Sequence, residues 1–427
     1  MANLLSNLST AWKALGLRAA PSVAAIQDKG KKIEGLEAVR GLAALVVLGE
    51  HSLGGFPMDS TCEIPDIIGQ LFFAHAAVLL FFLLSGYVIG LATMRPFTAI
   101  AGRIYALKRF FRIYPIFILS LLLAWTVAGP RNVVEAIGSF FVLTAYDDYF
   151  GLKIGPPAAN VPLWSLSYEA FYYVLFVAIW AWSPRWRTLF GIALGISIVS
   201  FLIPAFPAFL DGWASGFLFW GAGLWLAWNA TRGATLNRPL ITWCLLMAAV
   251  NRMPVLKYIG IGLMDRPFPG AIVGLKELAL LPTCLLVVCD AAGIVLPWRR
   301  VLIWLAFILP IGGTAIWIHQ KGLDFHDMRT VVALIDIAGA LACYRIRGNF
   351  SRMGWLAWIG GISYGIYALH FPIQNHFINH FPWNGTLVVT VAGYLLFYAT
   401  VVLLAWVVET GTRKFLLEPL RDRIRGG

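Results

Sequence analysis

Apolar runs of close to twenty residues recur along nearly the whole chain, and this feature limits the possible folds most strongly. A run of that length crosses the hydrocarbon core of a bilayer when it forms a helix. Of the 427 residues, 59% are hydrophobic and only 13% are charged, whereas a soluble domain carries roughly 25% charged residues. We therefore predict an all-α fold, a polytopic bundle of transmembrane helices in the cell membrane.

Twelve segments are predicted as spans, and ten remains an alternative because 251–269 is only weakly apolar. The predicted spans are 36–56, 69–94, 113–129, 162–182, 188–206, 212–230, 239–256, 270–292, 301–319, 330–344, 354–373 and 385–408. Loops rich in Lys and Arg alternate with poorer ones, and basic loops face the cytoplasm, so we predict that both termini are cytoplasmic. We divide the chain into a cytoplasmic amphipathic segment (1–34), a membrane domain (35–410) and a basic cytoplasmic tail (411–427).

The chain has a formal net charge of +12, from 33 Lys and Arg against 21 Asp and Glu. The basic residues lie mostly in short loops between spans, where they orient the chain, so we expect no nucleic-acid partner. The five cysteines show neither C-x-x-C nor metal-ligand spacing. We therefore expect neither a disulfide framework nor a metal.

The first predicted span contains the stretch AVRGLAALVVLGEHSLGGF, which places Arg40, Glu50 and His51 within one apolar run. Ionisable groups at membrane depth cost a few kcal/mol or more each, so their presence requires a reason. Eleven residues make about three helical turns, so Arg40 and His51 face the same way, roughly 16 Å apart along the helix. An interfacial anchor together with a buried, hydrogen-bonded histidine explains this pair about as well as a functional site does.

Further ionisable residues are expected near other span ends. Arg109 and Arg112 lie one turn apart, and two guanidinium groups on one face suit a phosphate, although ordinary loop charge explains them too. Glu169 lies about two turns inside the fourth span, where a carboxylate must be paired, protonated or in a cavity. His370 lies near the outer end of its span, and His75 is either part of the same site or a polar packing residue.

The chain contains, in order, the stretches RGLAALVVLGEH, FFLLSGYVIG, RFFRIYP, PLWSLSYEAFYY and ISYGIYALHFP. Together these stretches resemble the signatures of the acyltransferase-3 family, whose members are integral membrane enzymes that O-acylate the sugars of surface polysaccharides and related glycans. The resemblance covers residues 35 to 410. The chain departs from it at LEAVRG, where LDGLRG is usual, and at Ala170, where a second acid is frequent.

The resemblance implies transfer of an acyl group, usually acetyl, from a cytoplasmic acyl-coenzyme A to a hydroxyl group of a glycan acceptor. Acyl-coenzyme A is then a substrate, and no tightly bound cofactor is expected. We predict that Arg40, Arg109 and Arg112 hold its phosphates and that Ser85 belongs to the same donor site. The reach of the long arm of coenzyme A is comparable to the distance expected between Arg40 and His51.

The predicted catalytic group comprises His51, Glu169 and His370. His51 is the candidate general base, because an imidazole with a pKa of about 6.5 suits removal of a proton from a sugar hydroxyl. Glu169 is the candidate for orienting that imidazole. Ser85 and Ser167 are alternatives as nucleophiles, although the chain has no G-x-S-x-G elbow.

A secondary transporter or flippase is the main alternative, with Lys276, Glu277 and Asp336 as its coupling site. Transporters of this size usually contain internal repeats and paired interrupted helices, and the sequence shows neither. A membrane scaffold in a polysaccharide export complex is a third alternative. The transporter alternative also gives no reason for Arg109 and Arg112.

Overall fold

The computed structural model describes residues 34–53, 72–145, 147–149, 152–203, 205–232, 239–264, 273–346, 354–383 and 386–426. The predicted amphipathic segment, except for its last residue, lies outside these residues, as does Cys62.

The described chain is almost entirely helical. Its α-helices are α3 (Glu34–Leu53), α5 (Ala74–Ala92), α6 (Ala99–Val127), α7 (Val133–Phe140), α8 (Trp164–Trp182), α9 (Trp186–Leu202), α10 (Ala208–Asn229), α11 (Leu240–Arg252), α12 (Val255–Met264), α13 (Leu281–Ala292), α14 (Arg299–Lys321), α15 (Met328–Tyr344), α16 (Gly354–Gly361), α17 (Ser363–His380), α18 (Leu387–Thr412) and α19 (Glu418–Gly426).

Shorter elements connect these helices. The 3-10 helices η2 (Ala158–Leu163) and η3 (Leu275–Leu280) lead into α8 and α13, and the π-helix η5 (Arg413–Leu417) joins α18 to α19. Two antiparallel pairs of short strands are β1 (Asp147–Tyr149) with β2 (Leu152–Ile154), and β3 (Thr231–Arg232) with β4 (Ile294–Val295). In these ladders Asp148 pairs with Lys153 and Thr231 with Val295.

Six of the described helices are long and apolar enough to cross a membrane, or seven if the bent pair α16–α17 forms one span. This confirms a multi-pass, all-α membrane protein. A helix overlaps each of the twelve predicted spans, but several of these helices do not qualify as spans. Helices α9 and α15 have only 17 residues each, and α3 has 20 residues but carries four charged side chains. The expected ten to twelve spans are therefore not reached among the described helices.

Two predicted boundaries differ from the structure for identifiable reasons. Helix α6 begins at Ala99 instead of residue 113, capped by the Thr98 side chain, which accepts from the Ala101 N–H. The apolar run alone set the predicted start, whereas the helix continues through the basic stretch before it. The span predicted at 354–373 is two helices, α16 and α17, which meet at a bend of 68°.

Apolar surface on the outer helices fits a lipid environment. Large side chains that are exposed on these helices include Trp182, Ile192, Trp304, Ile308, Leu395 and Leu403. In the most apolar stretch of α14 only 28% of the residues are buried inside the protein, and in that of α18 only 22% are. Apolar patches of this extent are a liability in water but are the natural surface of a helix that faces lipid.

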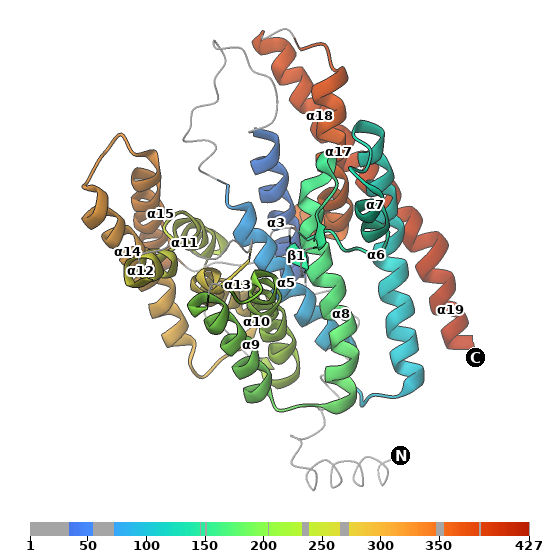
Figure 1. The fold of residues 1–427 in the computed structure, drawn as a ribbon, viewed down its shortest axis with the longest axis horizontal. Coiled ribbons are helices and arrows are strands. Elements are labelled where there is room, and N and C mark those ends of the chain that lie inside the picture. The colour runs from blue at the N-terminus through green and yellow to red at the C-terminus, as the bar shows by residue number, and fades with distance from the viewer. Residues whose placement is uncertain are drawn as a thin grey trace, which may run out of the picture.

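Helices α3 and α5 occupy the middle of the bundle (Figure 1). Helices α11, α12, α14 and α15 lie on one side of them, and α6, α17 and α18 lie on the other. Helix α5 packs closely along α10. A Cβ atom at Gly86 of α5 would overlap the carbonyl oxygen of Trp220, and one at Gly223 of α10 would overlap that of Leu83. Small residues allow such backbone contact between membrane helices.

We predict that Gly86→Ala lowers the thermal unfolding midpoint of the purified protein in detergent. The added methyl group must displace the backbone of α10, which costs about 1–3 kcal/mol, and the better helix propensity of Ala offsets only part of this. Gly191→Ala on α9 is the matched control, because a Cβ there meets no atom within 4 Å. A Gly86→Ala protein that melts at or above the temperature of Gly191→Ala would contradict the close packing of α5 on α10.

Candidate active site

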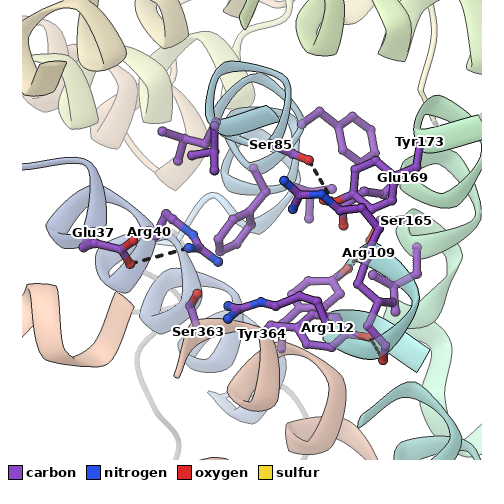
Figure 2. Close-up of a pocket in the computed structure, with 18 of the residues that line it drawn as sticks. Glu37, Arg40, Ser85, Arg109, Arg112, Ser165, Glu169, Tyr173, Ser363 and Tyr364 are labelled. Atoms are coloured by element: carbon purple, nitrogen blue, oxygen red, sulfur yellow. Dashed lines mark hydrogen bonds and ion pairs between the residues drawn. The ribbon is translucent and has the colours of Figure 1, made fainter. Parts of the chain in front are cut away.

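A cavity of about 500 Å³ lies between α3, α5, α6, α8 and α17 (Figure 2). Its polar and charged lining residues are Glu37, Arg40, Ser85, Arg109, Arg112, Ser165, Glu169, Tyr173, Ser363, Tyr364, Tyr367 and Arg413. The lining thus contains four arginines and two glutamates, which leaves two positive charges in excess. All four residues predicted for the donor site, together with Glu169, line this one cavity.

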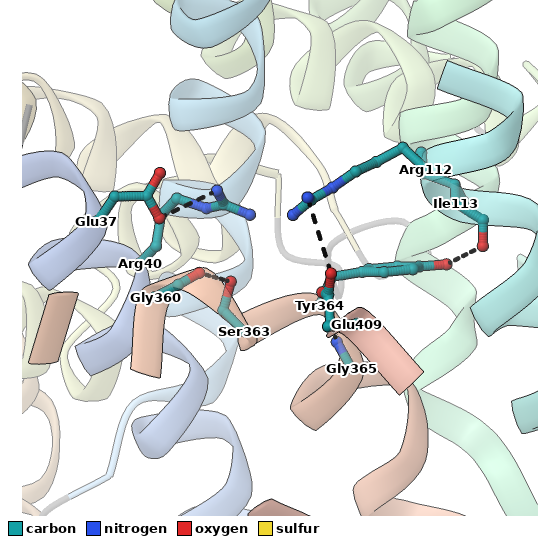
Figure 3. Close-up of polar contacts among 9 residues, drawn as sticks. All are labelled: Glu37, Arg40, Arg112, Ile113, Gly360, Ser363, Tyr364, Gly365 and Glu409. Atoms are coloured by element: carbon teal, nitrogen blue, oxygen red, sulfur yellow. Dashed lines mark hydrogen bonds and ion pairs between the residues drawn. The ribbon is translucent and has the colours of Figure 1, made fainter. Parts of the chain in front are cut away.

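Two of the lining arginines are paired with carboxylates (Figure 3). Nη1 of Arg40 lies 3.5 Å from Oε2 of Glu37, one turn earlier on α3. Nη1 of Arg112 lies 3.7 Å from Oε2 of Glu409 on α18. In each pair the carboxylate contacts one end of a guanidinium that carries five N–H donors. The remaining donors can therefore serve an anion in the cavity.

Arg109 lies next to a chain of hydrogen bonds that ends on a carboxylate. Its guanidinium carbon is 5.8 Å from the ring centroid of Tyr105 and 5.5 Å from that of Tyr173, which is a cation–π distance. The Tyr173 hydroxyl donates to Glu169, one turn earlier on α8. Because that hydroxyl has a single proton, it accepts from the hydroxyl of Ser85, 3.0 Å away. Ser85, Tyr173 and Glu169 thus form a directed chain along the cavity wall (Figure 2).

His51 and His370 form a hydrogen-bonded pair, with 2.9 Å between Nδ1 of His51 and Nε2 of His370. Nδ1 of His370 faces the carbonyl oxygens of Ile366 and Tyr367, at 3.1 and 2.8 Å. A carbonyl oxygen only accepts, so this nitrogen must carry a proton. In a neutral His370 the other nitrogen, Nε2, then accepts from Nδ1–H of His51. It follows that Nε2 of His51 carries the lone pair of the histidine pair.

The partner of His51 differs from the one expected. Glu169 was predicted to orient the His51 imidazole, but the structure pairs His51 with His370 and Glu169 with Tyr173. Neither histidine is among the described residues that line the cavity. Tyr367 connects the cavity with the histidine pair. Its side chain lines the cavity, where its hydroxyl lies 2.7 Å from that of Ser165, and its carbonyl oxygen accepts from His370. Depth along a predicted span could not distinguish these neighbours, because it carries no information on the rotation of each helix.

Glu50 and His75, two other ionisable residues singled out in the sequence, do not contact the histidine pair in the described contacts. Glu50 accepts from the backbone N–H of Ala74 at 2.5 Å, where it caps the first turn of α5. Nε2 of His75 lies 3.3 Å from Glu277, and the His75 ring stacks on Trp164. His75 therefore pairs with a different group from the one that contains His51, which agrees with the packing alternative for His75.

The break between α16 and α17 lies in the wall of the cavity. Its exposed backbone groups are satisfied locally: the Ser363 hydroxyl donates to the Gly360 carbonyl at 2.8 Å, and the Gly365 N–H donates to Glu409 at 3.2 Å. Glu409 is only 2% exposed and uses its second oxygen for Arg112. One buried carboxylate therefore joins α18 to the first turn of α17 and to a cavity arginine of α6 (Figure 3).

The residues proposed for a transporter do not form one site. Lys276 and Glu277 are adjacent, 3.8 Å apart, and share their location with His75. Asp336 instead forms a buried pair with Arg252, where α11 packs on α15. These contacts give no support to a coupling site built from all three residues.

Sequence reasoning missed three residues of the cavity and its support. Tyr173 follows Glu169 by four positions, which is the spacing of neighbours on a helix face and could have identified it. Glu409 is the one charged residue within α18, and a charge at membrane depth was an available signal. Arg413 was assigned to the basic tail, where its charge needed no further explanation.

The fold and the cavity together define a multi-pass membrane protein with a basic site inside its helical bundle. The acyltransferase domain model of the acyltransferase-3 family matches residues 33–410. The chain therefore belongs to the acyltransferase-3 family and is a membrane acyltransferase, as the sequence motifs predicted. No curated protein and no solved structure matches the chain.

We predict that Glu409→Ala lowers the thermal unfolding midpoint in detergent, with a loss of about 2 kcal/mol, because it strands the Gly365 N–H and the Arg112 guanidinium. Glu409→Gln should lose less, since its amide oxygen still accepts from the Gly365 N–H. Glu418→Ala is the control, because this glutamate is exposed on α19. Equal midpoints for the Glu409→Ala and Glu418→Ala proteins would exclude a structural role for the Glu409 contacts.

Proposed function

We propose that this acyltransferase moves an acyl group, in the usual case acetyl, from cytoplasmic acyl-coenzyme A to a hydroxyl group of a cell-surface polysaccharide or related glycan. The observation that carries the proposal is the cavity itself, because it joins arginines from α3 and α6 to a chain of hydroxyl and carboxylate groups. A donor with phosphates at one end and a thioester at the other matches this order of groups.

In this proposal the phosphates of the donor bind Arg40, Arg109 and Arg112. Charge-assisted bonds from guanidinium to phosphate are strong and directional, and the two excess positive charges of the lining favour a polyanion. The pantetheine arm then extends past Ser85 on α5. Its thioester lies toward Tyr367, the cavity residue nearest in sequence to His370.

The reaction then needs one base. Nε2 of His51 takes the proton of the acceptor hydroxyl as its oxygen attacks the thioester carbonyl, and collapse of the tetrahedral intermediate breaks the C–S bond and releases the coenzyme A thiolate. The new imidazolium keeps its Nδ1–H bond to His370, so His370 stabilises the charge without moving a proton. His51 can return the proton to the thiolate, which balances the reaction.

Glu169 is assigned a different task from the one predicted. Its carboxylate accepts a hydrogen bond from Tyr173. We propose that Glu169 thereby holds the Tyr173 and Ser85 hydroxyls in place beside the arm of the donor that carries the thioester. Because the Ser85 hydroxyl donates to Tyr173, its oxygen is left as a hydrogen-bond acceptor on the donor side of the cavity. Glu169 acts on the donor, while His370 acts on the base.

We predict that His51→Ala reduces acyl transfer by at least a hundredfold, because general-base catalysis contributes on that order, while binding of acetyl-coenzyme A persists. The assay is transfer of a labelled acetyl group by the purified protein to isolated glycan. His376→Ala is the matched control. This histidine lies on α17, 2.8 Å from Thr126, and its loss should leave transfer near the wild-type rate. Wild-type transfer by His51→Ala would remove the general-base role.

We also propose that the chain has ten to twelve spans with both termini in the cytoplasm, so that the arginine end of the cavity meets cytoplasmic donor. Support comes from the basic residues at the start of α6 and in the C-terminal tail.

Single cysteines in a cysteine-free background test this orientation. Ala158→Cys and Ala99→Cys each place a cysteine at an exposed position, the first at the start of η2 and the second at the start of α6. A membrane-impermeant reagent added to intact cells should label the first cysteine, and it should reach the second only after the membrane is opened. The reverse pattern would invert the orientation of the donor site.

A further inference from the structure

Arg413 is a fourth guanidinium in the lining of the cavity. It is the first residue of the π-helix η5, directly after α18, and η5 packs against α6, the helix that carries Arg109 and Arg112. Wide π-helical turns occur frequently at functional sites. The charge of a basic tail explains why an arginine is present here, but it does not explain why this one faces the cavity.

Arg413 differs from the other three arginines in its exposure. Arg40, Arg109 and Arg112 are partly buried, and two of them have carboxylate partners. Arg413 is exposed. A residue that lines the cavity and is also exposed lies at its mouth. The part of a ligand that Arg413 meets is therefore the part that enters last and remains nearest to solvent.

For a donor bound with its thioester toward Tyr367, the outermost charged group is the phosphate farthest from the thioester. In coenzyme A that group is the 3′-phosphate of the adenosine, a phosphomonoester with a charge of about −1.5 to −2 at neutral pH. The three deeper arginines are then left for the diphosphate, which carries the remaining negative charge of the donor.

We propose that Arg413 binds the 3′-phosphate of the donor and thereby selects coenzyme A thioesters over carriers that lack this group. The proposal rests on the proposed function, because it assumes an acyl-coenzyme A donor. It assigns a specificity role to a residue that the motifs do not include. The other carriers excluded in this way are 3′-dephospho-coenzyme A and a bare phosphopantetheine arm.

Lys414 provides a matched control one residue away. Its ammonium group lies 5.7 Å from the ring centroid of Phe415, and Lys414 is not among the described residues that line the cavity. Both residues are exposed, so Arg413→Ala and Lys414→Ala remove one positive charge from neighbouring surface positions. A general effect of net charge should be the same in both variants, whereas a contact with the 3′-phosphate should appear only in the first.

The experiment measures dissociation constants of coenzyme A and 3′-dephospho-coenzyme A for the full-length protein in detergent. We expect the wild type and Lys414→Ala to prefer coenzyme A by about tenfold, since a charge-assisted phosphate contact is worth roughly that much. Arg413→Ala should lose this preference through weaker binding of coenzyme A alone. Arg413→Lys should keep part of it, because a lysine restores the charge without the planar guanidinium.

The outcomes separate the two proposals. If the wild type binds coenzyme A but does not distinguish the two ligands, Arg413 has no such role and the donor assignment stands. The same conclusion follows if Arg413→Ala keeps the preference, or if Lys414→Ala loses it equally. If the wild type binds neither ligand, the donor assignment itself is overturned, and the role of Arg413 falls with it.

Discussion

Ionisable groups inside a membrane bundle have little water to solvate them, so each one needs a partner within the protein. Glu409 illustrates the consequence most clearly. Its carboxylate, buried in an otherwise apolar helix, receives the N–H of Gly365 and pairs with Arg112. These two contacts join α18 to the first turn of α17, just after the bend, and to a cavity arginine of α6. The same requirement joins Arg252 to Asp336 and Arg299 to Asp290 elsewhere in the described bundle.

The sequence was a better guide to which residues line the cavity than to which side chains they contact. Charges in apolar runs identified Arg40 and Glu169, and both line one cavity. This worked because the cost of a charge at membrane depth does not depend on knowing the fold. His51 and His370 were predicted to belong to one group, but their direct hydrogen bond was not predicted, because depth along a span carries no information on the rotation of each helix. The bend of 68° between α16 and α17 was also missed, because the apolar pattern of 354–373 continues through it.

The span count was not confirmed for a related reason. Hydropathy identifies segments that are apolar on all sides, whereas helices inside this bundle can be short or carry charge because other helices cover them. Helix α3 is an example, since it places Arg40 toward the cavity and Glu50 on the first turn of α5. Helix α10 is another buried case, and close contact with α5 at Gly86 and Gly223 replaces contact with lipid. Membrane thickness therefore says less about the central helices than about α14 and α18, which face outward.

The fixed proton on Nδ1 of His370 has a consequence for reversibility. The carbonyl oxygens of Ile366 and Tyr367 accept from Nδ1–H of His370, and Nε2 of His370 accepts from Nδ1–H of His51. Three of the four ring nitrogens are therefore already in hydrogen bonds. A proton can enter or leave the pair only at Nε2 of His51 without loss of a hydrogen bond. Under the general-base role proposed for His51, the forward and reverse reactions must exchange their proton at this same nitrogen. A molecule bound at Nε2 of His51 would therefore inhibit the proposed transfer and its reverse alike.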